Sequence, residues 1–234
     1  ESETILADLD LPFGTANLDF NNDPAQGIAE AVFSPDRLDE VFLDRLLAKC
    51  SEHLSMLAAP SMLDRNYDFD GDAFLPILDI VQRNAPVTVL DVPHLWNDWT
   101  RKVLSSSDEI VITATPDLAN LRNTKNLYDT LAKLRPNDTP PLLVLNQVGV
   151  AKRPEIGIDV FCEPLGVEPC AIIPFDAQLF GDASNSGLMI AEANAKSPVS
   201  ESLSQLAHIV TGRAEVKKRR KSGLGGLMGL LGRK

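Results

Sequence analysis

Cysteine and histidine are scarce in this sequence, and neither is arranged as a ligand set. The three cysteines form no CxxC pair, and the three histidines lie far apart in the chain. This spacing argues against a zinc site and against a disulfide framework. No apolar run approaches the roughly 18–20 residues that a membrane-spanning helix needs, and no charged-then-apolar signal peptide opens the chain. A reducing, cytoplasmic setting is therefore expected.

Charge is unevenly distributed along the 234 residues, whose formal net charge is −11. The segment from Arg213 to Lys234 holds eight Lys/Arg and one Glu, a net charge of +7. Residues 1–212 then hold 14 Lys/Arg against 32 Asp/Glu, a net charge of −18. An acidic body repels phosphate backbones, which disfavours DNA as a partner for the body as a whole. The sequence predicts two parts, a globular domain over residues 1–212 and a basic tail over residues 213–234.

Short apolar runs alternate with longer helix-like stretches, which is typical of βα units around a mostly parallel sheet. The predicted strands are Thr4–Ala7, Leu54–Ala58, Val87–Leu90, Ile110–Ala114, Leu142–Leu145 and Ala171–Ile173. The predicted helices are Pro24–Phe33, Asp36–Lys49, Asp72–Asn84, Leu95–Ser105, Leu118–Arg135, Glu155–Glu163 and Ser200–Gly212. Asp117, after Pro116, is placed to cap the fifth of them. We therefore expect an α/β fold of three layers, with helices on both faces of a mostly parallel sheet.

Polar side chains follow three of these strands. Asp8 and Asp10 come at the end of the first strand, Asp91 follows four apolar residues, and Asn146 follows Leu142–Leu145. Parallel sheets bind ligands beyond the carboxyl ends of their strands. A carboxylate after an apolar strand is the form of a Walker B site, which holds the water shell of Mg²⁺. An aspartate after an apolar run, taken alone, is usually a turn former or a helix cap; the three strand ends together favour a nucleotide site.

The strand ends resemble those of the MinD/ParA family of deviant-Walker P-loop ATPases over residues 3–212. Asp8-Leu9-Asp10 with Gly14 is similar to the family's second-strand motif, and Asp91-Val92-Pro93 to its Walker B and switch segment. Val111–Pro116 is similar to the following strand, and Asn146 to the family's adenine-side Asn. The late loop that closes over adenine resembles Ile173-Pro174-Phe175-Asp176 and then residues 183–187.

The resemblance within the family is greatest to the CpaE/TadZ proteins, which localise the Tad (Flp) pilus machinery at the inner membrane. It rests on the Asp8–Gly14 opening, the Pro93-His94 pair with Trp96 and Trp99, and the Pro-Phe-Asp loop. It implies ATP and Mg²⁺ as cofactors and a nucleotide-dependent homodimer. Asp10 would position or activate the attacking water, and Asp8 and Asp91 would hold Mg²⁺, mostly through water. Asn146, Pro174, Phe175 and Asp176 would bind adenine.

The family's phosphate-binding loop, KGGxGK[ST], does not occur in these 234 residues. Its backbone N–H groups and lysines bind the phosphates at a helix N-terminus. We expect the chain to lack the first βα unit of the domain, about 40 residues by the usual size of such units. Phosphoryl transfer depends on positioning and charge neutralisation, so we expect no useful ATP hydrolysis from this chain.

The basic tail has the pattern of a membrane anchor. Its basic cluster is followed by apolar residues at spacing i, i+3, i+4, i+7, in the order Lys217, Lys218, Arg219, Arg220, Lys221, Leu224, Leu227, Met228 and Leu231. This spacing lines one face of a helix behind a polybasic patch, and it resembles the membrane-targeting helix of MinD-type proteins. The alternative is a solvated, disordered tail.

The sequence thus favours a positioning factor of the Tad pilus system, on the cytoplasmic face of the inner membrane and concentrated at a pole. Its partners would be a second copy, the pilus machinery and anionic lipid. The alternative is a chromosome- or plasmid-partitioning ATPase of the ParA type that binds DNA nonspecifically, which the acidic body disfavours. A metabolic enzyme related to dethiobiotin synthetase is a third possibility, with no substrate-pocket motif to support it.

Overall fold

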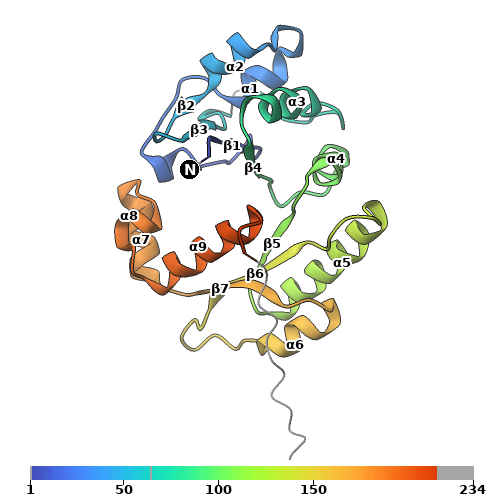
Figure 1. Cartoon of the computed structure of the whole chain (residues 1–234), viewed down its shortest axis with the longest axis vertical. Helices are drawn as coiled ribbons and strands as arrows, with labels where there is room; N and C mark the ends of the chain where they lie inside the picture. Colours follow the sequence, from blue (N-terminus) through green and yellow to red (C-terminus); the bar gives the residue numbers. More distant parts are fainter. Residues whose placement is uncertain (1, 64, 215–234) are drawn as a thin grey trace, which may run out of the picture. The chain divides into compact units, whose positions relative to one another are not determined.

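The computed structural model describes residues 2–63 and 65–214. They form two compact units (Figure 1). The first unit contains the residues up to Ile110, together with Thr130–Pro140 and Asp176–Glu201. The second unit contains Val111–Asp129, Pro141–Phe175 and the described residues from Ser202 onward.

The first unit is built on a four-stranded sheet in the order β2-β3-β1-β4. Strands β1 (Thr4–Asp8), β3 (Leu54–Leu57) and β4 (Val87–Asp91) are parallel, and the short β2 (Ala48–Lys49) pairs antiparallel with β3. The register of β1 and β4 places Asp8 directly opposite Asp91. Strand β4 has a neighbour on one side only among the described residues, and Val89 in its middle is 47% exposed.

Three helices of the first unit begin at residues whose side chains cap them. Asp39, Asn97 and Asp176 each accept a backbone N–H from the first turn of α2, α4 and α7, which satisfies donors that the helix itself leaves unpaired. The α-helices are α1 (Ile28–Phe33), α2 (Glu40–Leu46), α3 (Leu75–Asn84), α4 (Asp98–Ser106), α7 (Ala177–Ser186) and α8 (Ile190–Asn194). The 3-10 turns are η1 (Leu18–Phe20) and η2 (Pro35–Arg37).

The core of the first unit joins its sheet to α1–α4. Phe74 is its centre, with its ring 4.5 Å from that of Trp99 and 5.6 Å from that of Phe69. The buried residues are Ile5, Ala7, Leu9, Leu11, Ile28, Ala29, Ala31, Val32, Leu43, Leu46, Leu57, Phe74, Ile77, Leu78, Val81, Ala85, Trp99 and Val103. Because Leu9 and Leu11 belong to this core, the Asp8–Gly14 segment that carries the candidate site is anchored on both sides of Asp10.

The second unit has a three-stranded parallel sheet in the order β5-β6-β7. Its strands are β5 (Val111–Ala114), β6 (Leu142–Val148) and β7 (Pro169–Pro174). Helices α5 (Leu118–Leu134) and α9 (Pro198–Val210) each begin in one unit and end in the other, and α6 (Ile158–Cys162) with the 3-10 turn η3 (Glu163–Leu165) belongs to the second. The core here is smaller: Ala114, Leu143, Leu145, Phe161 and Cys162.

The α/β class with mostly parallel strands is confirmed, although the described strands fall into two sheets. Three parts of the sequence prediction were wrong. Ala48–Lys49 ends the expected second helix and is instead a strand, because it pairs with β3. Glu155 precedes α6, which begins at Ile158. Residues 183–186, expected in a loop, are the last turn of α7, which Asp176 caps and Gly187 ends with φ of 61°.

Candidate functional site

Asp8 and Asp91 lie side by side at the carboxyl end of the first unit's sheet. They occupy equivalent positions on β1 and β4, and Leu9 N donates to Asp91 O at 2.9 Å. Asp10 is two residues beyond Asp8, in a turn where Phe13 N and Gly14 N donate to its carbonyl oxygen. The structure therefore brings together the three carboxylates that the sequence picked out.

The carboxylate of Asp8 is fully buried and held by two backbone N–H groups. Asp10 N donates to Oδ1 at 3.1 Å, and Ala16 N donates to Oδ2 at 3.2 Å. Gly14 closes over this group: a Cβ at Gly14 would lie 2.3 Å from Asp8 Oδ1. Only glycine fits there, because any side chain would displace the carboxylate. The sequence motif contained Gly14 without revealing this contact.

Burial and mutual repulsion disfavour the charged forms of the carboxylates in this cluster. Burial raises the pKa of Asp8 above its usual value, and the charges of Asp91 and Asp10 raise it further, while the two N–H donors oppose the shift. The pKa of Asp91 is also raised, by partial loss of hydration and then by Asp10. Asp91 is still exposed to solvent, which weakens both effects on it. Among the described residues, no Lys, Arg or His forms an ion pair with these carboxylates.

Carboxylate oxygens that lack a cation suit a hard divalent ion such as Mg²⁺. Residues 2–63 and 65–214 contain no group of three His, Cys, Asp or Glu side chains placed to ligate one ion directly. Two neighbouring carboxylates suit the predicted role of Asp8 and Asp91, which is to hold Mg²⁺ mostly through its water shell. That role, and the role of Asp10, remain predictions.

Asn146 lies near the end of β6 in the second unit, and its amide is already oriented. Gln147 N donates to Asn146 Oδ1 at 2.8 Å, which leaves the Nδ2 hydrogens to donate elsewhere. Phe175 N donates to Val148 O at 2.8 Å, and Pro174 lies opposite Val148 in the register of β6 and β7. Asn146, Pro174 and Phe175 thus share one end of this sheet, and the Phe175 ring is partly exposed.

Asp176 has a different position. It belongs to the first unit and caps α7, with Oδ1 accepting Leu179 N at 2.9 Å. This is the ordinary helix-cap alternative for an aspartate after a strand, and the proposed contact of Asp176 with adenine stays a prediction.

Asp117 at the end of β5 caps α5, as the sequence predicts. Its carboxylate accepts Asn120 N at 2.9 Å and Thr115 Oγ1 at 2.6 Å. These hydrogen bonds lower the pKa of Asp117, that from Asn120 N most of all. Asp117 therefore stays ionised and satisfied, and it is not a candidate proton donor.

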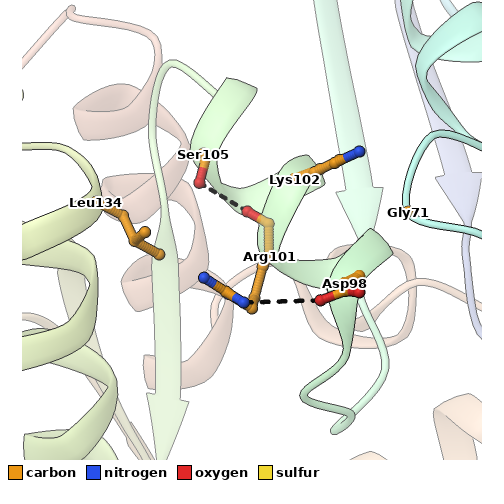
Figure 2. A pocket seen from close by; sticks show the side chains of 6 residues that line it. All are labelled: Gly71, Asp98, Arg101, Lys102, Ser105 and Leu134. Carbon is orange, nitrogen blue, oxygen red and sulfur yellow. Dashed lines mark hydrogen bonds and ion pairs between the residues drawn. The ribbon is translucent and has the colours of Figure 1, made fainter.

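A pocket of about 250 Å³ lies beside α4 (Figure 2), and its lining does not include Asp8, Asp10 or Asp91. Its lining contains two cations, but Arg101 and Lys102 point away from each other (Figure 2). Each is already paired, Arg101 with Asp98 at 3.6 Å and Lys102 with Asp72 at 2.5 Å. The remaining lining residues are Gly71, Ser105 and Leu134. These groups do not converge on one anion, so we assign no ligand to this pocket.

Comparison with known proteins gives matches in structure only. No protein-family model and no curated protein matches the sequence. The ParA family ATPase of Chlorobium tepidum superposes with a TM-score of 0.78 at 22% identity, over 88% of this chain and 86% of that one. The chain has the ParA/MinD fold. MinD of Pyrococcus horikoshii, solved with Mg-ADP, matches with a TM-score of 0.77 at 17% identity, over 94% of this chain and 87% of that one.

Other structures with the ParA/MinD fold contain a partner or a nucleotide. The MinC:MinD complex of Aquifex aeolicus matches with a TM-score of 0.73 at 17% identity, over 93% of this chain and 86% of that one. The ATP complex of a Cyanothece McdA variant matches with a TM-score of 0.69 at 12% identity, over 93% of this chain and 88% of that one. At these identities the likeness establishes the fold, and the predicted fold is confirmed.

No helix among the described residues has both the length and the apolar character to cross a bilayer. The predicted membrane-contacting residues, from Lys217 to Leu231, lie outside the described part of the chain.

Proposed function

We propose that this chain is a MinD/ParA-like, nucleotide-dependent dimerising factor that positions the Tad (Flp) pilus machinery at the cytoplasmic membrane. The observation that carries the nucleotide role is the cluster of Asp8, Asp10 and Asp91 at the ends of two adjacent parallel strands. Strand ends of this kind are where open α/β sheets bind ligands. The fold is shared with a MinD that was solved with Mg-ADP and with a McdA variant that was solved with ATP.

The residues of the cluster divide the chemistry between them. Asp8, fixed by its two N–H donors, and Asp91 would hold the hydrated Mg²⁺, and Asp10 would orient the attacking water. A bound Mg²⁺ neutralises charge on the phosphates during transfer. In the second unit, Asn146 would donate from Nδ2 to the adenine ring, beside Pro174 and Phe175.

The open edge of β4 supports a place for the phosphate-binding loop. A further parallel strand paired with β4 would end next to Asp91, so a glycine-rich loop after that strand would begin beside the carboxylates. Such a loop, with its lysines, would also supply a positive charge that the cluster does not receive from the described residues.

The nucleotide role is tested with a fusion. A strand, KGGxGK[ST] loop and helix taken from a MinD is joined in front of Glu1, and Mg-ADP binding is measured by calorimetry. We expect binding by the fusion, at least tenfold weaker binding after Asp91→Asn, and unchanged binding after Asp79→Asn, a surface aspartate paired with Arg83. Equal effects of the two substitutions, or ATP hydrolysis by the 234-residue chain alone, would contradict the proposal.

The dimer is tested on the same fusion by light scattering. Mg-ATP should double the molar mass and Mg-ADP should not. A mass that does not respond to nucleotide would remove dimerisation from the proposal.

The pilus role rests on the residues that resemble CpaE/TadZ proteins, including Pro93-His94 with Trp96 and Trp99. A Tad-piliated bacterium that lacks its own CpaE is complemented with a fluorescently tagged copy of the protein. We expect a focus at the pilus site and restored pili. Foci on the nucleoid without pili would favour the partitioning alternative.

The tail is proposed to bind anionic lipid. Deletion of residues 215–234 should abolish co-sedimentation with vesicles of phosphatidylglycerol, whose surface attracts polybasic segments. Vesicles of phosphatidylcholine and a duplex DNA filter assay are the controls. Unchanged binding to anionic vesicles after the deletion, or retention of DNA in preference to vesicles, would refute the anchor.

A further inference from the structure

In the loop that follows Asn146, the carboxylate of Glu155 accepts several hydrogen bonds from other residues of the same loop. Gly149 N donates to Glu155 Oε1 at 3.0 Å and to Oε2 at 3.1 Å, and Val150 N donates to Oε1 at 3.1 Å. Arg153 Nη2 donates to Oε1 at 3.0 Å. The Glu155 side chain therefore binds both the backbone turn at Gly149 and Val150 and the guanidinium of Arg153.

Arg153 also forms hydrogen bonds with Gln147, the residue next to Asn146. Its Nη2 also donates to Gln147 O, and its Nη1 donates to Gln147 Oε1 at 3.3 Å. The Glu155 side chain is 20% exposed and that of Arg153 is 31% exposed, so both are largely shielded from solvent. We refer to Glu155 and Arg153 with these contacts as the loop clamp.

The backbone inside the clamp is strained. Gln147 has φ of 53° and Lys152 has φ of 63°, in the left-handed region that side chains disfavour, and Gly149 has φ of 85°. Such conformations persist only where surrounding contacts impose them, and they concentrate at functional sites. Ile156 N also donates to Pro116 O at 2.8 Å, which fixes the far end of the loop to the end of β5.

The strained Gln147 sets the orientation of Asn146. Its N–H donates to Asn146 Oδ1, so the direction of the Asn146 amide depends on the conformation that the clamp imposes on Gln147. Nothing else in the described contacts of Asn146 fixes its side chain.

We propose that Glu155, acting through Arg153 and Gln147, is a positioning residue that aims the Asn146 amide at the base of a bound nucleotide. This inference rests on the proposed nucleotide role. Glu155 does not touch the base; it makes the loop hold one conformation before the ligand arrives.

The test uses adenosine as the probe, because it lacks phosphates and so requires no phosphate-binding loop. The ¹⁵N-labelled full chain is titrated with adenosine, and the Asn146 side-chain amide signals are followed by NMR. We expect them to shift in the wild type, and Glu155→Gln to weaken the apparent affinity at least tenfold. Glu192→Gln is the matched control, since Glu192 also accepts a backbone N–H, from Met189 at 2.9 Å, at the start of α8.

Hydrogen exchange provides a second readout. The amides of Gly149 and Val150 should lose at least tenfold protection in Glu155→Gln, while the amides of β6 keep theirs. The hydrogen bond from Gly149 N, and then Arg153, hold the pKa of Glu155 below its usual range. Arg153 is the charged side chain that faces it. In the wild type, the protection of the Gly149 and Val150 amides should therefore stay constant from neutral pH down to the ordinary glutamate pKa of about 4.3. It should fall only below that pH.

The outcomes separate the two claims. If adenosine shifts Asn146 equally in the wild type and in Glu155→Gln, the positioning role is wrong and the nucleotide role stands. If adenosine does not shift Asn146 in the wild type, the base site fails and the positioning role fails with it. Loss of protection throughout β6 in Glu155→Gln would show a general structural role and would also overturn the inference.

Discussion

The ends of the two sheets differ in charge. In the first unit, Asp8, Asp10 and Asp91 crowd together without a cation among the described residues, and the pKa values of Asp8 and Asp91 rise. In the second unit, the carboxylates at the strand ends are satisfied: Asp117 by Asn120 and Thr115, Glu155 by Gly149 and Arg153, and both of these pKa values fall. The first end is thus short of positive charge among the described residues, whereas at the second end the charged groups are paired and the neutral amide of Asn146 is left to donate.

The hydrophobic cores of the two units also differ in size. Among the described residues, the cluster of buried hydrophobic side chains around the first unit's sheet is larger than the cluster in the second unit. A strained acidic cluster needs a rigid support, because like charges would otherwise move apart. The second unit fixes the carboxyl ends of its strands by hydrogen bonds within loops. The comparison predicts that substitutions in the first unit act mainly through packing and charge, and the following changes test this in order of expected size.

Phe74→Ala should have the largest effect, because Phe74 is 1% exposed and lies at the centre of the aromatic core. Removal of a buried phenylalanine costs about 3–5 kcal/mol of unfolding free energy. Trp99, whose ring is 4.5 Å away, reports the loss by fluorescence in urea titrations. Phe13→Ala, at a side chain 74% exposed, is the control and should change stability by less than about 0.5 kcal/mol. Similar losses in both variants would show that the aromatic core does not support the first unit.

Gly14→Ala should come next. The new methyl group would lie 2.3 Å from the buried Asp8 carboxylate, which is held by two N–H groups and cannot move freely. Such overpacking costs about 1–3 kcal/mol. Gly157→Ala is the matched control, because its Cβ would meet no atom nearer than 4.0 Å. Thermal unfolding of the two variants distinguishes a close approach at Asp8 from a general preference for glycine; equal shifts would contradict the close approach.

Thr88→Val should stabilise the first unit. Thr88 Oγ1, on β4, is buried without a hydrogen-bond partner in the described part of the chain, so replacing it with a methyl group removes a desolvation penalty and should gain about 1 kcal/mol. Thr100→Val is the contrasting change, because the Thr100 side chain completes the N-terminal cap of α4 with Asn97 and should cost about 1 kcal/mol. Urea midpoints that move in the same direction would contradict this account.

Asp91→Asn should have the smallest effect. It shows whether the negative charge of Asp91 stabilises or destabilises the folded state. A raised pKa means that the folded state binds the proton more tightly than the unfolded state does. The contribution of Asp91 to the unfolding free energy is therefore greatest below the ordinary aspartate range and is lost as pH rises through the folded pKa. At neutral pH the variant should be more stable by roughly 0.5 kcal/mol or less, since solvent screens this site.

The difference in stability between Asp91→Asn and wild type is measured from pH 4 to pH 7, with Asp79→Asn as the control. If the stability advantage of Asp91→Asn shrinks as the pH rises, the charge of Asp91 does not destabilise the folded state.

The sequence predicted the apolar strands well because near-continuous Val, Ile and Leu runs are distinctive. It also predicted the cap at Asp117 and the meeting of Asp8 with Asp91, since parallel strands must end at one edge. It did not predict β2, whose two residues form a strand only through β3. The small polar residues of α7 concealed a helix that Asp176 begins.

The loop clamp escaped prediction for a related reason. Glu155 reads locally as the start of a helix, and its true partners depend on the positive φ angles of Gln147 and Gly149. The sequence contains one signal for a shaped loop, the glycines at 149 and 157 on either side of Pro154. A long-range hydrogen-bond pattern of this kind becomes visible only once the chain is folded.

The edge of β4 has a consequence for handling the protein in solution. The backbone groups of β4 that no described strand pairs can template strands of other molecules, which is a route to aggregation. Two features oppose this route: Pro86, which has no N–H to offer, precedes the strand, and the charge of Asp91 ends it. Because burial raises the pKa of Asp91, acidification neutralises this side chain at a higher pH than it would an ordinary aspartate. Acidification should therefore weaken one of the two features that protect the β4 edge and favour aggregation.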